Sequence, residues 1–124
     1  MDFNLKLLGD LQVYDIPYLS LYADEVSQTF YLAFRISARY DLVADYAVTP
    51  VSANRLLDYI NQKITVKDLF RESDQLFLWH KQRGMKGGLS LSGDRRLEEK
   101  VDNSKYNPHL CEDEEVILDY LQGI

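Results

Sequence analysis

The sequence is poor in the residues that most often carry chemistry. Its 124 residues include one cysteine and two histidines. A single cysteine excludes an internal disulfide, and zinc sites normally draw on four ligands from paired cysteines or histidines. The chain is long enough to build one hydrophobic core without such staples. We therefore expect a single domain, residues 1–124, without a cofactor.

The sequence also lacks targeting and membrane segments. Residues 1–6 have neither the basic start nor the apolar run of a signal peptide. No apolar run approaches the roughly 20 residues that are needed to span a bilayer. These features predict a cytoplasmic protein with no membrane partner.

Charge is acidic overall and unevenly distributed. The formal net charge is −6, and residues 79–100 carry +3, whereas residues 1–78 and 101–124 carry −4 and −5. An acidic protein repels phosphate backbones, which disfavours general nucleic-acid binding. The basic segment is the exception.

The clearest secondary-structure signal lies at residues 30–37. Phe30, Leu32, Phe34 and Ile36 alternate there with Tyr, Ala, Arg and Ser, which predicts the central strand of an antiparallel sheet with one apolar and one mixed face. Short polar connections predict a meander. Other strand-like segments occupy residues 5–13, 18–22, 45–49, 75–80 and, as half of a hairpin, 89–94. The Gly9-Asp10 dipeptide predicts a turn or a bulge in the first of them.

After Pro50 the apolar period changes from that of a strand to that of a helix. Ser52 can cap a helix over residues 52–61, and Thr65-Val-Lys-Asp68 resembles a capping box for a second short helix over residues 65–72. Acidic residues 112–115 precede an apolar stripe, which predicts a C-terminal helix.

The predicted fold class is α+β. We expect an antiparallel meander of four to six strands, the two short helices on one sheet face, and a C-terminal helix. Residues 1–80 would form the core, 81–110 a flexible basic loop or hairpin, and 111–124 the acidic helix.

Three groups of residues offer candidate chemistry. His80, His109 and Cys111 are the only conventional nucleophile, base or soft metal ligands, and they would have to converge in space. Acids at 112–115 disfavour a Cys111 thiolate. The glycine-rich segment 84–88, flanked by basic residues, lacks the spacing of a nucleotide-binding Walker loop. The acids at 24–25 and 112–115 lack calcium-loop spacing; they are either solvated or imitate nucleic-acid phosphates.

A succession of motifs over residues 11–79 resembles a family of small uncharacterised bacterial domains. That family has a D-x-P turn, a YLA strand, a strand end of the P-V-S kind, and a short helix ending in a Phe. The matching segments here are Val13-Tyr-Asp-Ile-Pro17, Tyr31-Leu-Ala-Phe-Arg35, Tyr46-Ala-Val-Thr-Pro-Val-Ser52, Arg55-Leu56 and Ile64-Thr-Val-Lys-Asp-Leu-Phe70. The resemblance implies the meander with helices and supplies no catalytic residue.

The leading hypothesis is a non-enzymatic protein-interaction module of bacterial or mobile-element origin, of an accessory, immunity or inhibitor type. The chain's nine tyrosines exceed what a domain of this size needs; tyrosine is common in strands, which is the first explanation, and also at contact surfaces. The expected partner-binding residues are Arg83, Lys86, Arg95, Arg96, Tyr18 and Tyr22. Alanine substitution of Arg83, Lys86, Arg95 and Arg96 should weaken partner binding without lowering thermal stability.

Two alternatives from other classes stay open. The first is a nucleic-acid-binding accessory protein that uses the basic loop 81–96. The second is a small enzyme that uses His80, His109 and Cys111. In the leading hypothesis the expected partner is another protein, whose identity the sequence does not give.

Overall fold

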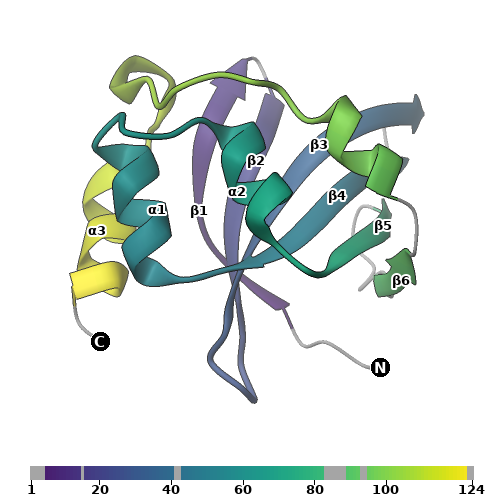
Figure 1. Ribbon diagram of the computed structural model, residues 1–124, viewed down its shortest axis with the longest axis horizontal. Helices are drawn as coiled ribbons and strands as arrows, with labels where there is room; N and C mark the ends of the chain where they lie inside the picture. Colours follow the sequence, from purple (N-terminus) through teal and green to yellow (C-terminus); the bar gives the residue numbers. More distant parts are fainter. Residues whose placement is uncertain (1–4, 15, 41–42, 83–88, 93–94, 123–124) are drawn as a thin grey trace.

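The computed structural model describes residues 5–14, 16–40, 43–82, 89–92 and 95–122. Within these residues the strands form one six-stranded antiparallel sheet in which each strand pairs with the next along the chain (Figure 1). The strands are β1 (Leu5–Tyr14), β2 (Ile16–Asp24), β3 (Phe30–Tyr40), β4 (Val43–Val51), β5 (Leu76–Gln82) and β6 (Leu89–Ser92). The predicted meander is confirmed.

The helices lie over one face of this sheet, as predicted (Figure 1). Helix α1 (Ala53–Ile60) begins at Ser52, whose side chain accepts a hydrogen bond from the Arg55 amide. Helix α2 (Val66–Glu72) begins with a complete capping box, in which Thr65 and Asp68 each accept from the other's backbone amide. The C-terminal helix α3 (Glu114–Gln122) packs against β1. The predicted α+β class is therefore confirmed.

The segment between β6 and α3 is packed against the rest of the domain. It forms two 3-10 helices, η1 (Arg95–Lys100) and η2 (Pro108–Leu110). Leu97, Val101 and Tyr106 from this segment are buried in the main hydrophobic cluster. Residues 95–110, which the sequence placed in a flexible loop or hairpin, thus contribute to the core.

Both faces of the central strand β3 are buried. Leu32 and Phe34 belong to the main cluster, which lies between the sheet and the helices. Tyr31 and Ala33, on the face that the sequence predicted to be mixed, belong to a second cluster on the opposite side. The members of this second cluster are Tyr22, Tyr31, Ala33, Val48, Phe77 and Trp79.

The second cluster joins strands that are not neighbours. The rings of Tyr22 on β2 and Trp79 on β5 meet edge to face with centroids 5.2 Å apart, although β3 and β4 separate their strands. Strands three positions apart in a flat sheet lie roughly 14 Å from each other. The small side chain of Ala33 and the strong twist of the sheet allow the two large rings to lean together (Figure 1).

The edge strand β1 makes a close contact with the C-terminal segment. A register shift between Leu7 and Gly9 marks the bulge that the Gly9-Asp10 dipeptide predicted. A Cβ atom at Gly9 would lie 2.9 Å from Cβ of Asp113 and 2.9 Å from Cγ1 of Ile117. Next to it, the Asp10 amide donates a hydrogen bond of 2.8 Å to Oδ2 of Asp113. Glycine is required here because no side chain fits.

In the part of the chain that the structure describes, no helix has the length and apolar character to cross a membrane.

We expect Gly9→Ala to displace α3 and lower the free energy of unfolding by about 1–3 kcal/mol, the usual cost of overpacking. Urea denaturation would measure this loss. Ile117→Ala removes the Cγ1 and Cδ1 atoms that the new methyl group would meet, so in that background the same substitution should cost clearly less. An equal loss in both backgrounds would assign the cost to Cβ of Asp113, the other atom 2.9 Å from the new methyl group, and not to Ile117.

Candidate functional site

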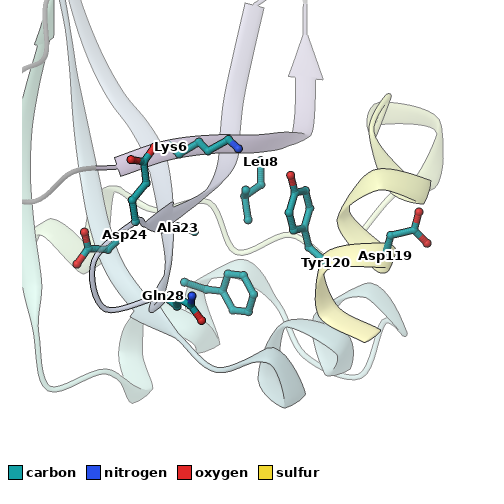
Figure 2. A pocket seen from close by; sticks show the side chains of 9 residues that line it. Lys6, Leu8, Ala23, Asp24, Gln28, Asp119 and Tyr120 are labelled. Atoms are coloured by element: carbon teal, nitrogen blue, oxygen red, sulfur yellow. The ribbon is translucent and has the colours of Figure 1, made fainter. Parts of the chain in front are cut away.

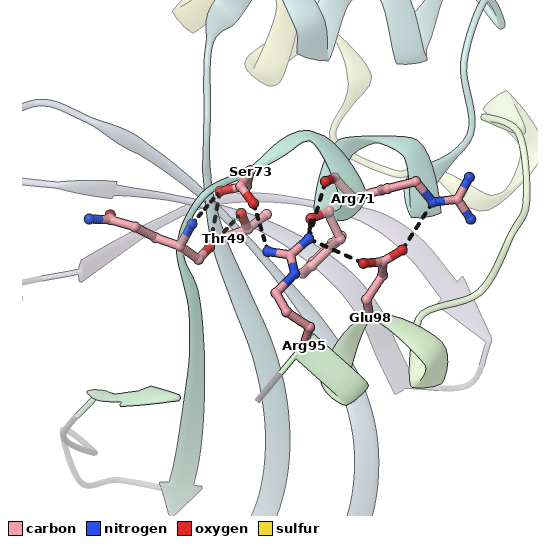
Figure 3. Close-up of polar contacts among 7 residues, drawn as sticks. Thr49, Arg71, Ser73, Arg95 and Glu98 are labelled. Atoms are coloured by element: carbon pink, nitrogen blue, oxygen red, sulfur yellow. Dashed lines mark hydrogen bonds and ion pairs between the residues drawn. The ribbon is translucent and has the colours of Figure 1, made fainter. Parts of the chain in front are cut away.

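Arg95, one of the predicted partner-binding cations, is turned toward the end of α2 (Figure 3). Its guanidinium donates to the carbonyl oxygens of Ser73 at 2.7 Å and Arg71 at 3.1 Å, and more weakly to that of Phe70 at 3.4 Å. These carbonyls have no partner within the helix, so Arg95 caps the C-terminal end of α2. Its side chain therefore has a structural role.

Glu98 connects the two arginines of this region (Figure 3). Its carboxylate accepts from Nε of Arg71 at 3.0 Å and from Nη2 of Arg95 at 3.1 Å. Two hydrogen bonds hold the pKa of Glu98 below its usual value, the one from Arg71 with the larger effect and the one from Arg95 with the smaller. Arg96 is exposed on the same 3-10 helix and is also engaged within the chain. Arg83 and Lys86 lie outside the described residues.

The two predicted tyrosines have different environments. Tyr22 is only 5% exposed and packs against Trp79. Burial, with a smaller effect of Asp10, raises its pKa to about 12. The prediction that Tyr22 is an exposed contact residue is wrong, because its side chain completes the second cluster. Tyr18 is half-buried and reaches the surface beside Tyr14.

The candidate enzymatic residues occupy separate elements. His80 lies on β5, whereas His109 lies on η2, which packs against β1 at the far side of β2, β3 and β4. Cys111 donates a weak hydrogen bond of 3.5 Å to the Asp10 carbonyl, and burial raises the pKa of its thiol. A thiol with a raised pKa is a poor nucleophile at neutral pH. Among the described residues, no group of three or more His, Cys, Asp or Glu could hold a metal ion.

Two pockets lie near opposite ends of β1. The first, which we call the α3 groove, has a volume of about 460 Å³ and lies between the start of β1, the β2–β3 hairpin and α3 (Figure 2). Its lining residues are Lys6, Leu8, Ala23, Asp24, Glu25, Gln28, Phe30, Asp119 and Tyr120. Leu8 and Phe30 are buried members of the main cluster, so the groove reaches down to the hydrophobic core.

The hairpin wall of the α3 groove is held by its own hydrogen bonds. Asp24 accepts at Oδ2 from the Ser27 hydroxyl at 2.7 Å, and its backbone carbonyl accepts from the Gln28 amide at 2.7 Å. Gln28 takes a left-handed conformation, with φ of 59°. The turn thereby presents Val26 at its tip, where this side chain is 85% exposed.

The helical wall carries a second exposed apolar stripe. Val116 and Tyr120 are one turn apart on α3 and are 48% and 41% exposed, while Ile117 and Leu121, each one residue further along, enter the core. The sequence showed these four residues as one apolar stripe. The sequence does not show which of these side chains are buried, because that depends on how α3 packs against the distant strand β1.

The second pocket, which we call the tyrosine pocket, has a volume of about 350 Å³ and is lined by Gln12, Tyr14, Tyr18, Phe34 and Asp102. The rings of Tyr14 and Tyr18 meet nearly at right angles, 77° between planes, with centroids 5.6 Å apart. The Gln12 amide nitrogen donates to the hydroxyls of Tyr59 at 3.1 Å and Ser104 at 3.0 Å, which fixes the floor.

Comparisons with protein-family models, with curated proteins and with solved structures find no match to this chain. The resemblance seen over residues 11–79 therefore stays a prediction. Function has to be inferred from the two pockets and the surfaces around them.

Because Arg95 caps α2, we expect Arg95→Ala to lower the free energy of unfolding by about 1 kcal/mol, a value reduced by the exposure of the side chain. This revises the expectation that alanine here leaves stability unchanged. Thermal or urea unfolding measures the effect. Lys100→Ala, on the same 3-10 helix, is the matched control and should change stability by less than about 0.5 kcal/mol. Equal stability of both variants would show that the capping contacts contribute nothing.

Proposed function

We propose that this chain is a non-enzymatic protein-interaction module that acts in the cytoplasm as an accessory, immunity or inhibitor protein of a bacterium or mobile element. The observation that carries the proposal is the α3 groove, whose floor is apolar and whose hairpin and helix walls belong to elements that also expose apolar side chains. Val26, Val116 and Tyr120 are three of the five large hydrophobic residues that are exposed among the described residues.

An apolar surface of this kind is typical of docking sites. Monomeric proteins seldom expose contiguous apolar patches unless a partner covers them. Tyrosine in particular is enriched among the few residues that dominate binding energy, since it offers a large rigid contact area with a polar tip. Tyr120 stands at the mouth of the groove in this way (Figure 2), with Leu8 and Phe30 beneath it as an apolar floor.

The charges around the groove favour a basic partner. Glu25 and Asp119 are exposed lining residues and Asp24 lies deeper, whereas Lys6 is the one basic residue in the lining. A negative rim attracts a positively charged surface and raises the rate of association. The partner segment that fits is therefore an apolar side chain flanked by lysine or arginine.

The raised pKa of the Cys111 thiol also supports a binding role over nucleophilic chemistry. The nucleic-acid alternative uses the basic loop 81–96, which includes Arg95. Because the Arg95 guanidinium caps α2, its position counts against that alternative. Neither observation depends on the α3 groove.

A photo-crosslinking amino acid at position 120 tests the proposal in lysate of the source cells. One protein should be captured with and without nuclease, and the same residue at position 63, exposed beyond α1, should not capture it. Capture that disappears after nuclease treatment would instead favour nucleic-acid binding. Equal capture from both positions would count against the groove.

With the captured protein in purified form, we expect Val116→Ser and Tyr120→Ser each to weaken binding by about tenfold or more, as for a central anchor. Both side chains are substantially exposed, so the melting temperature should change little. Calorimetric titration measures the affinity. Lys63→Ala is the control and should bind like the unmodified chain. Unchanged affinity in both serine variants would place the interface elsewhere.

A further inference from the structure

The tyrosine pocket combines aromatic walls with a carboxylate. Tyr14, Tyr18 and Phe34 supply three aromatic side chains, and Asp102 supplies the acidic group. Tyr14 is 49% exposed, so its ring is accessible to a ligand. The pocket lies near the end of β1 that is distant from the α3 groove, so it forms a separate site.

The ring geometry suits a cation. The face of an aromatic ring is electrostatically negative and attracts a positive group within about 6 Å of its centre. Two rings at 77° form adjoining walls of a corner, and a cation placed in that corner can lie against more than one aromatic side chain. The Gln12 amide nitrogen is already committed to Tyr59 and Ser104, so the floor is fixed in place before any ligand arrives.

The added carboxylate distinguishes between kinds of cation. A quaternary ammonium group needs aromatic walls and has no N–H to donate. A guanidinium group is planar, stacks on aromatic rings and donates paired hydrogen bonds to a carboxylate. Asp102 among the lining residues therefore favours the guanidinium group.

We propose that the tyrosine pocket binds the arginine side chain of a partner protein, with Tyr14 and Tyr18 as aromatic walls and Asp102 as the acceptor. The chain's net charge of −6 favours the approach of such a side chain. This inference does not require the α3 groove to be a docking site.

The probe is N-acetyl-arginine amide, titrated into the full chain while the tyrosine ring signals are followed by NMR. We expect saturable shifts of the Tyr14 and Tyr18 signals with weak, roughly millimolar affinity. N-acetyl-citrulline amide has nearly the same shape without the charge and should cause little change. Equal binding of the citrulline probe would overturn the proposal.

Three variants locate the interaction. Tyr14→Leu and Asp102→Asn should each weaken binding of the arginine probe by about fivefold, whereas Tyr14→Phe, which keeps the ring, should bind nearly as well as the unmodified chain. Lys63→Ala, exposed beyond α1 and outside the lining of both pockets, is the control and should change nothing. Loss of binding in the control, or full binding in both Tyr14→Leu and Asp102→Asn, would contradict the assignment.

Two further probes test the class of ligand. A capped trimethyl-lysine that binds more tightly than capped arginine would overturn the guanidinium assignment in favour of a quaternary ammonium group. Free arginine adds an α-ammonium and a carboxylate whose charges cancel, so we expect it to bind no more tightly than the capped form. Tighter binding of free arginine would overturn the assignment to a protein partner and indicate a small-molecule site.

Discussion

The close approach of the C-terminal segment to the edge strand β1 is the contact on which the α3 groove depends. Gly9 leaves no side chain between the strand and Ile117, and the Asp10 amide is satisfied by Asp113. This contact fixes the position of α3, so that Tyr120 stands over Leu8 and Phe30 in the α3 groove. Along the same strand, the buried Gln12 ties β1 to α1 through Tyr59 and fixes the floor of the tyrosine pocket.

Burial on both faces of the sheet explains why the candidate sites lie near the ends of a strand. The helices cover one face with the main cluster, and the aromatic second cluster occupies the other around Ala33 and Val48. The broad faces of the central strands are therefore used for stability. Exposed apolar side chains remain where β1 meets the hairpin tip and α3 in one direction, and where Tyr14 ends the strand in the other.

Local signals predicted the elements well, and long-range contacts account for what the sequence did not show. The alternation around Leu32 and the caps at Ser52 and Thr65 are set by neighbours within a few residues, so the sheet, helices and α+β class followed from the sequence. Tyr18 and Tyr22 are equivalent in the local pattern. Tyr22 is buried by long-range packing in the second cluster, including the ring of Trp79 from across two intervening strands. The capping role of Arg95 likewise depends on a helix end more than twenty residues earlier in the chain.

The geometry of β1 also restricts how a partner could bind. A free edge strand invites the addition of another strand, because its backbone groups are unpaired. Here the middle of the edge is occupied, since the Asp10 amide donates to Asp113 and its carbonyl accepts from Cys111. A strand added along all of β1 would have to displace this segment and α3 with it. Recognition through side chains in pockets avoids that cost.

The ten residues of β1 span roughly 30 Å, so one extended segment of about nine residues could place a basic-flanked apolar anchor in the α3 groove and an arginine in the tyrosine pocket. Joining two weak sites on one partner raises the overall affinity well above that of either alone, which makes a modest arginine site useful.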